Sequence, residues 1–467
     1  MLATPAHTPT PRRKRTLIHR GIFDHIFARY GKKVKDYYNL TLLDPAYRVE
    51  LPSGAVDVPG TYEGILSMAK ERGGPDADLA LRLFFDEAEV KFEQGVYDFI
   101  WKPMISFTEL IDTALMRAGL ELDMFSSFSS HLSRFTKDPL IHMLLKWPVI
   151  FIGASPDDAA SMYSLMTYAG HVRGTWYPDG GLGAPARALA SIAEEMGVTL
   201  RLASEVTELR LDPENPERIG AVCGAGGDCT PVDGLLAAAD YEWVEQKLLP
   251  PHLQRYDTAF WERQVLSPST ILFYLGFDQR LPGLIHHTFF FDEELDTHLD
   301  HVFAREPPRG EYARQPTFYV SATSKTDPMV QPANNSAAET VFVLIPIHHR
   351  LNGSDTSEVR AAALEMVLNR MQTRMQQRCG AEATKEEACG PEKDLRSAMV
   401  YSRSYGPEDF EDDHHSFRGN AFGLANTLAQ SLILKPSLDA KATNMVGQEG
   451  GRKGGREREG GREGGRE

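Results

Sequence analysis

The chain has few cysteines and no excess of basic residues, and each shortage argues against a class of function. Four cysteines occur among its 467 residues, at Cys223, Cys229, Cys379 and Cys389. Their spacings match neither a zinc knuckle nor a redox CxxC motif, so we expect free thiols in a reducing compartment, with a Cys379–Cys389 disulfide as the alternative. The formal net charge of −15 argues against nucleic acid as a partner, because phosphate binding needs a basic surface.

Long apolar runs are also missing. The richest stretch, residues 144–153, is interrupted by Lys146 and Pro148, whereas a membrane-spanning helix needs about 20 apolar residues. We therefore expect any membrane contact to be peripheral. Residues 1–20 hold basic residues, no acid and no secretory signal. We expect a disordered or misassigned start there, with a piece of transit peptide as the alternative.

A nucleotide-binding fingerprint is the third absence. Flavin and nicotinamide folds carry GxGxxG between a strand and a helix, and the beginning of this chain has no such motif. The glycines at 224–227 are no substitute, because they lie in a predicted hairpin and no helix follows them. The sequence alone therefore contains no standard site for a dinucleotide phosphate.

The most informative stretch that is present runs from Gly174 to Asp240. It opens with Gly174-Thr-Trp-Tyr-Pro-Asp-Gly-Gly-Leu-Gly183, a turn rich in glycine. Apolar residues at helical spacing then predict a helix that ends at Gly197. An alternating pattern predicts a strand over 198–209, and the turn-rich residues 220–228 predict a hairpin. A run of small residues leads to Asp240 and would let the backbone come close to a bound group.

The flanking regions differ in type. Residues 60–172 have the apolar spacing of helices, with a proline break at 101–107. Strand patterns between 270 and 347 predict a mainly antiparallel sheet, and 359–375 predict an amphipathic helix. Methionines and aromatic residues in the helical region are expected either to form a core or to line an apolar tunnel, and both interpretations stay open. They are Trp101, Met104, Phe107, Met116, Met124, Phe125, Phe128, Phe135 and Met143.

Several of these sequence motifs closely resemble those of the carotenoid desaturases of the phytoene desaturase type, which are flavoproteins of the amine-oxidase-like superfamily. The resemblance rests on Gly174-Thr-Trp-Tyr-Pro-Asp-Gly-Gly, on Thr-Leu-Arg-Leu-Ala-Ser-Glu-Val-Thr, and on Ala-Ala-Ala-Asp ending at Asp240. Leu-Asp-Pro-Ala-Tyr-Arg ending at Arg48 and Ser416-Phe-Arg-Gly-Asn-Ala-Phe-Gly add to it. It extends from about Gly21 to Leu438.

The resemblance implies an α/β fold, specifically an incomplete two-domain FAD-dependent oxidoreductase. Its Rossmann-like flavin domain would lack the first βαβ unit and the glycine-rich segment after Leu438, and its substrate domain would combine an antiparallel sheet with helices. We expect a chain truncated at both ends, with weakened FAD binding. The expected parts are a disordered or misassigned start (1–20), a substrate or helical region (21–173), the remaining FAD-binding part (174–250), the substrate domain (251–405), a return to the FAD domain (406–440) and a disordered Gly/Arg/Glu repeat (441–467).

The activity implied by the resemblance is FAD-dependent oxidation of phytoene towards lycopene in carotenoid biosynthesis. The partner would be a long apolar polyene in a dry tunnel, and the cofactor would carry the redox chemistry. Two alternatives stay open: a carotenoid cis–trans isomerase or another carotenoid desaturase of the same superfamily, and an inactive truncated remnant that binds lipid. We expect a peripheral membrane location, in a plastid for a photosynthetic eukaryote and otherwise on the cytoplasmic membrane face.

The resemblance also supplies cofactor-binding positions. Val206 would meet the adenine through its backbone, and Ala239 and Asp240 would lie by the pyrophosphate. Gly180 and Gly181 would form a free turn beside the flavin domain, and Gly419, Gly423 and Leu424 would lie towards the flavin face. The full set is Gly180, Gly181, Val206, Ala239, Asp240, Gly419, Gly423 and Leu424.

Catalytic residues are marked only weakly. The candidates are Asp44, Arg48 and His287. For Asp44 and Arg48 a buried structural salt bridge competes with a role at the substrate. For His287, proton transfer competes with a solvent-facing place at a strand end. Adjacent histidines on a strand point to opposite faces, so the three His-His pairs predict no metal site.

Overall fold

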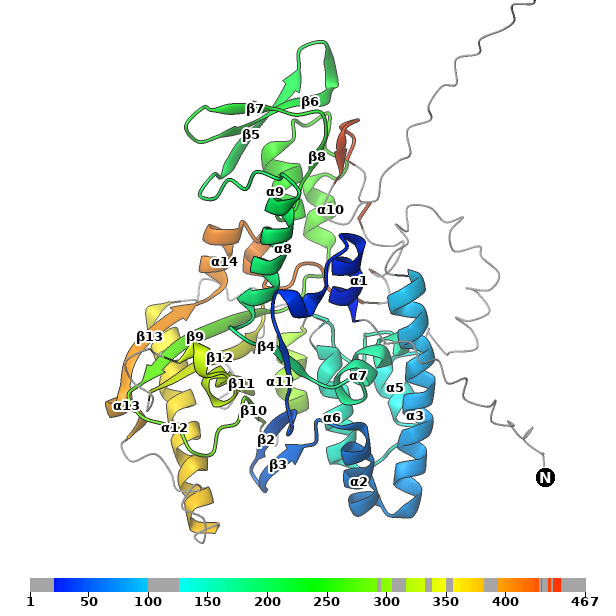
Figure 1. Cartoon of the computed structure of the whole chain (residues 1–467), viewed down its shortest axis with the longest axis vertical. Helices are drawn as coiled ribbons and strands as arrows, with labels where there is room; N and C mark the ends of the chain where they lie inside the picture. Colours follow the sequence, from blue (N-terminus) through cyan, green and yellow to red (C-terminus); the bar gives the residue numbers. More distant parts are fainter. Residues whose placement is uncertain are drawn as a thin grey trace, which may run out of the picture.

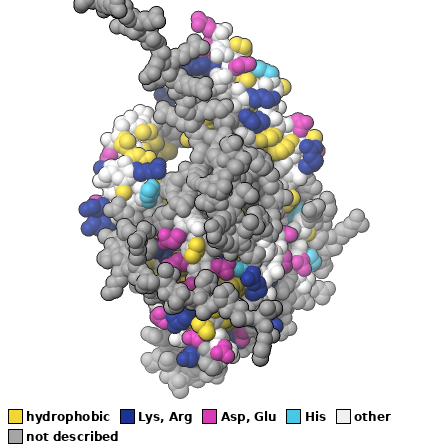
Figure 2. Space-filling view, turned by 90° about the vertical axis from the view of Figure 1, so that its right-hand side faces the viewer, with side chains coloured by type: hydrophobic (Ala, Val, Ile, Leu, Met, Phe, Trp, Pro, Cys, Tyr) yellow, Lys and Arg dark blue, Asp and Glu magenta, His cyan; other side chains and the backbone are white. Residues whose placement is uncertain are grey.

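The computed structural model describes residues 21–446, apart from 100–125, 151, 292–294, 305–315, 332–337, 350–355, 382–393, 428–429, 431–435 and 438–439. Predictions for residues 1–20, for the proline break at 101–107, for the repeat from 447 onwards and for Cys389 lie outside this range. Figure 1 shows a sheet with α12 on one side, a group of helices beside it, and a second, smaller sheet at the far end. On the face in Figure 2, basic and acidic side chains are interspersed.

A seven-stranded sheet forms the middle of the molecule, in the order β13-β9-β12-β11-β10-β2-β3. All neighbours are antiparallel except β10 and β2, so the prediction of a mainly antiparallel sheet is confirmed. The strands are β2 (Tyr47–Leu51), β3 (Gly54–Val58), β9 (Ser269–Phe277), β10 (His287–Phe290), β11 (Phe318–Ser321), β12 (Glu339–Ile347) and β13 (Met399–Tyr405).

The long helix α12 (Ser357–Ala381) covers one face of this sheet (Figure 1). Burial along β12 alternates residue by residue, as expected for a strand with one packed face. Val341 and Val343 of β12 share a core with Val367 and Leu368 of α12. The predicted amphipathic helix at 359–375 is therefore confirmed, and its apolar side is the one that packs on the sheet.

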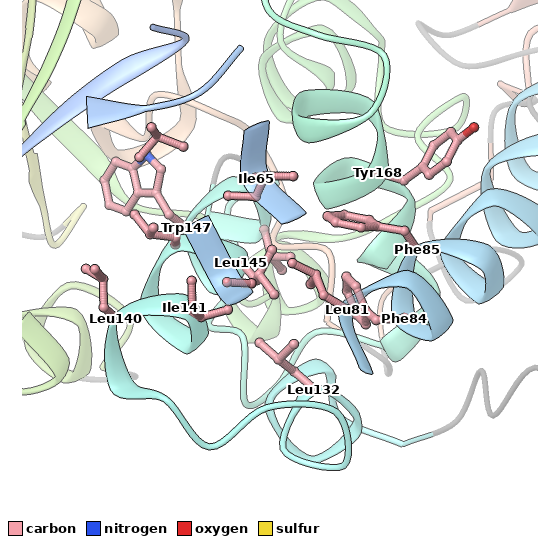
Figure 3. Close-up of a cluster of buried hydrophobic side chains, with 14 of the residues drawn as sticks. Ile65, Leu81, Phe84, Phe85, Leu132, Leu140, Ile141, Leu145, Trp147 and Tyr168 are labelled. Carbon is pink, nitrogen blue, oxygen red and sulfur yellow. The ribbon is translucent and has the colours of Figure 1, made fainter. Parts of the chain in front are cut away.

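The predicted helical region has its own dense core (Figure 3). Phe84 and Phe85 pack edge to face with a ring-centroid separation of 5.4 Å. Of the methionine and aromatic stripe, Phe128 is fully buried in this core, with Phe135 and Met143 against it; the other six members lie outside the described residues. The elements are α2 (Tyr62–Gly73), α3 (Pro75–Glu93), η2 (Gln94–Phe99), α5 (Phe128–Leu132), α6 (Pro139–Ile150), η4 (Ser161–Tyr163), α7 (Ser164–His171) and α11 (Leu295–Val302).

The prediction of a strand beginning at Val198 is wrong. Helix α8 (Gly183–Glu195) ends before Gly197, whose φ is +87°, as predicted. The chain then has no regular structure until β5 (Val206–Asp212), and Leu202 is 87% exposed. The apolar alternation at 198–202 is real, but no neighbouring strand in the described part of the chain supplies hydrogen bonds to it. A strand needs such a partner as well as the pattern.

The prediction that all cysteines are free thiols is also wrong. Strands β5, β6 (Asn215–Gly224) and β7 (Cys229–Pro231) form a three-stranded antiparallel sheet, which confirms the hairpin at 220–228. Within it Cys223 and Cys229 stand directly opposite each other and form a disulfide. Opposite positions of an antiparallel pair bring Cβ atoms close enough for a bridge. The spacing of the cysteines along the chain matches no zinc or redox motif, and it does not reveal that two of them face each other across the hairpin.

The remaining elements connect these parts. Strands β8 (Leu235–Leu236) and β14 (Met445–Val446) form a short parallel pair, and β1 (Leu40–Leu42) pairs with β4 (Trp176–Pro178). Among the described residues, no helix has the length and apolar character to span a bilayer. The other helical elements are α1 (Ile22–Arg29), η1 (Val34–Asp36), α9 (Tyr241–Trp243), η5 (Val244–Leu248), α10 (Thr258–Arg263), η6 (Thr323–Lys325), η7 (Pro328–Val330), α13 (Leu395–Ala398), α14 (Pro407–His414) and η9 (Phe417–Gly419).

Candidate functional site

The glycine turn after β4 is held in place from two sides. Gly180 and Gly181 have φ of +84° and +91°, a region in which L side chains are strained, so glycine is required at both positions. The amide of Gly180 donates to Oδ2 of Asp327 at 2.7 Å, and its carbonyl accepts from Nη2 of Arg187 at 2.9 Å. Asp327 directly precedes η7, which lies between β11 and β12 of the large sheet. The hydrogen bond therefore connects the glycine turn to the region of this sheet.

Next to this turn lies an aromatic pair that contains a buried imidazole. The rings of Tyr177 and His286 meet edge to face with centroids 4.5 Å apart. Nδ1 of His286 lies 2.8 Å from Oγ1 of Thr326, whereas its Nε2 is buried without a hydrogen-bond partner among the described residues. Burial lowers the pKa of His286 to about 4, although the nearby Asp327 carboxylate opposes the shift. The imidazole is therefore neutral at pH 7, with one ring nitrogen left for another molecule.

The neighbouring His287 points to a different partner. Its Nδ1 lies 2.6 Å from the hydroxyl of Tyr319 on the adjacent strand. Burial, and then the adjacent His286, lower the pKa of His287 to about 3, and burial raises that of Tyr319 to about 12. Both groups are therefore uncharged at neutral pH, and a hydrogen bond joins the phenol to the imidazole. His287 therefore does not occupy the solvent-facing place at a strand end that was the alternative for this residue.

The other two catalytic candidates have structural partners. Arg48 is buried, and its Nη2 donates to Oδ2 of Asp57, directly across the β2–β3 pair, at 2.7 Å. Its Nη1 donates to the carbonyl of Gly283 at 2.7 Å. Oδ1 of Asp44 accepts from the amide of Gly60 at 2.9 Å. The ion pair with Asp57 favours the salt-bridge alternative for Arg48. For Asp44 the contact is a hydrogen bond to a backbone amide, and both alternatives remain predictions.

A second cluster forms around Asp240. This residue caps α9, where its Oδ1 accepts from the amide of Trp243 at 3.1 Å, and its Oδ2 accepts from the amide of Phe417 at 3.4 Å. Burial raises the pKa of Asp240, and these amide hydrogen bonds oppose the shift. One carboxylate thus joins the segment after β8 to the segment after α14.

The same cluster includes a stacked pair and a strained turn. The rings of Trp243 and His415 are 4.1 Å apart and almost parallel, and Nε2 of His415 lies 3.0 Å from Oε1 of Glu205. Glu205 is the residue before Val206, so this contact brings the predicted adenine position to the Asp240 cluster. His415 and Arg418 have φ of +54° and +58°, and such strain in residues other than glycine concentrates at functional sites.

The three positions predicted to face the flavin are held differently. Gly419 has φ of +63°, and a Cβ there would lie 2.8 Å from the carbonyl oxygen of Pro407. Gly423 also has a positive φ, but a Cβ there would meet nothing within 4 Å. Its carbonyl accepts from the amide of Ser267 at 3.0 Å, and Leu424 bridges to Leu266. The backbone at Gly423 is therefore open to the approach of another group.

The surroundings of Ala239 are tight. The cavity lined by Ala239, Tyr241 and Met445 has a volume of about 10 Å³, about the minimum that accommodates one water molecule. Nε2 of His286, which is buried without a partner among the described residues, and Gly423, where a Cβ would meet nothing within 4 Å, are the features that fit a bound group. At Ala239 the described residues leave no room for a ring.

Sequence reasoning missed several residues of these clusters. Asp327, Tyr319 and Trp243 carried no motif of their own, and their roles come from contacts between distant segments. Tyr177 lay inside the quoted turn motif but was not singled out, although a buried tyrosine generally has a partner for its hydroxyl. Among the described residues, no three His, Cys, Asp or Glu side chains gather as metal ligands. The expected absence of a metal remains a prediction.

Comparisons with known proteins agree on one group. The profile of the family described as "Flavin containing amine oxidoreductase" matches residues 82–416. Carotenoid 3,4-desaturase of Haloarcula japonica is 30% identical over 425 residues, covering 91% of this chain and 80% of that protein. A zeta-carotene-forming phytoene desaturase of Myxococcus xanthus is 25% identical, covering 91% and 77%, and a lycopene-forming phytoene desaturase of Pseudescherichia vulneris is 24% identical, covering 88% and 78%. Among solved structures, an oxidoreductase from Methanosarcina mazei is 10% identical with a TM-score of 0.48, covering 88% of this chain and 76% of that one.

Proposed function

Because this chain belongs to the flavin-containing amine oxidoreductase family, we propose that it is an FAD-dependent desaturase that oxidises phytoene towards lycopene. Its fold is that of an α/β FAD-dependent oxidoreductase, and it is an oxidoreductase that acts on CH–CH bonds of carotenoids. Our proposal goes further in two respects: phytoene is the substrate, and FAD is the form of the flavin. We also propose a peripheral membrane location, from which a long polyene could be taken up.

The observation that carries the proposal is the uncharged cluster beside the Gly180–Gly181 turn. His286, His287 and Tyr319 are all held in their neutral forms by burial. A hydrocarbon offers no charge or hydrogen bond to compensate a buried ion, so a site for a polyene should present neutral groups. An amine substrate would instead call for a fixed negative charge. The two carboxylates at this turn are already satisfied, because Asp327 accepts from the amides of Gly180 and Met329 and Asp179 accepts from the hydroxyl of Thr41 at 2.9 Å.

Cofactor contacts are assigned to glycines, at which no Cβ keeps another group away from the backbone. We place the flavin ring between the Gly180–Gly181 turn and Gly423, and the nucleotide part towards Asp240 and Val206. A bound flavin would supply the acceptor for the two electrons of each desaturation. Gly180 and Gly181 would let backbone approach it closely, because they carry no Cβ.

The chain itself would supply a place for the proton. Oxidation of a CH–CH bond removes a hydride from one carbon and a proton from its neighbour. Loss of the hydride makes the neighbouring C–H strongly acidic, so a weak base is sufficient. Nε2 of His286 is neutral, buried and without a partner among the described residues, and it is the atom we assign to accept that proton. Tyr177 and Thr326 would fix the orientation of the ring.

The test begins with the purified chain incubated with FAD and freed of excess. We expect the two visible absorption bands of bound flavin. Phytoene in phospholipid vesicles, with an artificial electron acceptor, should then yield products with longer conjugated systems, detected by chromatography and absorbance. A protein that stays colourless after incubation would overturn the proposal of an FAD enzyme.

Two further outcomes separate the alternatives. Bound flavin with interconversion of geometric isomers, and no gain of double bonds, would support a carotenoid isomerase instead. Bound flavin with turnover of another carotenoid, but not of phytoene, would support a different desaturase of the family. A heat-denatured sample with free FAD controls for reactions of the free cofactor.

A further inference from the structure

The segment that contains η6 and η7 holds His286 through both its backbone and its ring. The amide of Ala322 donates to the carbonyl of His286 at 2.9 Å, so the segment is fixed against the start of β10. The amide of Asp327 donates to the carbonyl of Thr323 at 3.0 Å, which closes the turn. Oγ1 of Thr326 lies 2.8 Å from Nδ1 of His286. The position of this hydroxyl relative to the imidazole is therefore set by backbone hydrogen bonds.

The contact between Thr326 and His286 determines which ring nitrogen carries the proton. A neutral imidazole has one N–H donor and one acceptor nitrogen, and the hydrogen bond at one nitrogen fixes the character of the other. If Nδ1 donates to the hydroxyl, Nε2 has a free lone pair and can accept a proton. If Nδ1 accepts from the hydroxyl instead, Nε2 carries a hydrogen and cannot act as a base. The proposed role of His286 therefore depends on the direction of one hydrogen bond.

Burial of the ring favours the arrangement in which Nδ1 donates. Nε2 of His286 is buried and has no partner among the described residues. Among buried backbone groups, N–H donors without an acceptor are rarer than acceptors with an unused lone pair, and the same desolvation cost applies to a ring N–H. A proton on Nε2 would create such an orphan donor, whereas a proton on Nδ1 has the hydroxyl of Thr326 as its acceptor. This hydroxyl is only partly buried, so it can accept from Nδ1 and still donate its own hydrogen.

The charges around the ring suit a base that becomes a cation. Within the part of the chain that the structure describes, His287 and Tyr177 contact the imidazole, and both are neutral at pH 7. The negative charge of Asp327 favours the protonated form of His286 and opposes the fall in its pKa. Hydrogen bonds from the amides of Gly180 and Met329 hold this carboxylate in place. An imidazolium formed at His286 therefore has a fixed counter-charge.

We propose that Thr326 is a positioning residue for the desaturation: its hydroxyl accepts from Nδ1 of His286, which leaves the lone pair of Nε2 free for the substrate proton. The inference rests on the proposed function and adds to it the place of the imidazole proton. In the assigned step, a C–H bond of the substrate breaks, its electron pair forms the new double bond, and the proton binds Nε2. The hydride lost from the neighbouring carbon carries its two electrons to the flavin. The Nδ1–H bond to Thr326 stays intact throughout.

The first experiment determines the tautomer without any turnover. The full chain, incubated with FAD, carries nitrogen-labelled histidine, and the ring signals of His286 are identified by their loss in His286→Phe. The chemical shifts of a protonated and a bare ring nitrogen differ widely. At pH 7 we expect a protonated Nδ1 and a bare Nε2 in the parent and in Thr326→Ser, which keeps the hydroxyl. In Thr326→Val the form with the proton on Nε2 should appear, because Nδ1 has lost its acceptor. A parent with the proton on Nε2, or an unchanged tautomer in Thr326→Val, would overturn the inference.

Kinetics then test the role of Thr326 in the reaction. Thr326→Val should lower kcat for phytoene about tenfold and change KM by less than about twofold, because it removes a hydrogen bond that positions the base and no contact with the substrate. Thr326→Ser should recover most of the rate. Thr270→Val is the matched control, because the Thr270 hydroxyl is also buried, lies in β9 and has no partner among the described residues. Its tautomer signals and kcat should equal those of the parent. An equal kcat in Thr326→Val and the parent would remove Thr326 from the reaction.

Failure of this inference and failure of the proposed function give different results. A parent that binds flavin and desaturates phytoene, but carries the proton on Nε2, would retain the function and overturn the role of Thr326. A parent that turns over no carotenoid would overturn the function, and the assigned role with it. Circular dichroism of each variant checks the fold, and Thr326→Ala provides a second variant without the hydroxyl if Thr326→Val does not fold.

Discussion

The imidazole of His286 meets the ring of Tyr177 edge to face, with centroids 4.5 Å apart. Tyr177 belongs to the β4 strand that leads into the glycine turn, and His286 precedes β10 of the large sheet. The contact therefore joins the segment expected to hold the cofactor to the segment expected to hold the substrate. Since Nε2 of His286 is left without a partner among the described residues, the pair is the most direct place to test the proposed chemistry.

Replacement of His286 by phenylalanine should slow desaturation strongly while flavin binding persists. The ring contact with Tyr177 would remain, but the proton acceptor would be lost, and general-base groups contribute about 10²–10⁴-fold. The measurement is phytoene turnover at saturating substrate, with the flavin spectrum recorded on the same sample. His171→Phe is the matched control, because His171 is equally buried but lies in the helical core. Unchanged turnover in His286→Phe would remove this residue from the mechanism.

Acid should destabilise the protein through its buried histidines. His171 is 2% exposed, and burial lowers its pKa to about 4, whereas an unfolded histidine titrates near 6.5. Between those values the unfolded state binds the proton and the folded state does not, so stability is present above pH 6.5 and is lost as pH falls towards 4. The loss for this one group is about 3 kcal/mol. Urea unfolding at pH 7 and pH 5 should show a smaller difference in His171→Phe than in the parent.

Gly419 and Gly423 offer a matched pair of substitutions. Both have positive φ, but only at Gly419 would a Cβ collide with Pro407, whose carbonyl oxygen would be 2.8 Å away. Gly423→Ala should cost only the backbone strain, about 1–2 kcal/mol. Gly419→Ala should cost that amount plus the displacement of Pro407 and its backbone, and should therefore be clearly the less stable variant in thermal unfolding. Equal stability of the two would contradict the close approach at Pro407.

The sequence predicts those helices and strands whose hydrophobic period agrees with the neighbours they pack against. The four strands between 269 and 347 and helix α12 all follow a clear hydrophobic period. Residues 198–202 have an equally clear period, yet they form no strand. The difference is not local, because hydrogen bonding of a strand depends on a neighbour that the pattern cannot specify.

In the candidate site, too, local features could be predicted from the sequence, whereas contacts between distant segments could not. Glycines at 180 and 181 could be predicted as a turn, since glycine-rich spelling signals positive φ. The hydrogen bond from Gly180 to Asp327 spans 147 positions, and nothing in the sequence near Asp327 indicated it. The Cys223–Cys229 bridge is an intermediate case. The turn-rich residues 220–228 predict the hairpin, but its register, in which the two cysteines stand opposite each other, does not follow from their spacing.

The disulfide in that hairpin can be checked directly. Alkylation of the unfolded, unreduced protein, followed by peptide mass spectrometry, should leave Cys223 and Cys229 unlabelled, and reduction should make both reactive. A bridge that closes such a short loop contributes on the order of 2 kcal/mol in the chain-entropy description. Cys223→Ser should therefore lower the unfolding free energy of the oxidised protein, and addition of reductant should erase the difference between variant and parent. Labelling without reductant would contradict the bridge.

The ion cluster in the helical region gives the last prediction. The Lys91 side chain is almost fully buried, and its Nζ lies 2.8 Å from Oε1 of Glu87, which is also 3.2 Å from Nε2 of His131. Burial raises the pKa of Glu87, but hydrogen bonds from His131 and Lys91 outweigh it and bring the value to about 2. Glu87→Gln would remove the carboxylate that Lys91 and His131 share, so we expect a loss of stability of up to about 3–5 kcal/mol.

A second variant separates the charge from the shape of this cluster. In Glu87→Gln/Lys91→Met both charges are gone and the volumes are nearly kept, so most of the lost stability should return, as replacement of buried ion pairs by apolar groups is often neutral. The measurement is urea unfolding of the parent, Glu87→Gln and the double variant at pH 7. Because the low pKa of Glu87 makes its contribution vanish as pH falls from about 4.5 towards 2, the deficit of Glu87→Gln should shrink over that range. A double variant no more stable than Glu87→Gln would show that the carboxylate matters for packing around His131 rather than for pairing with Lys91.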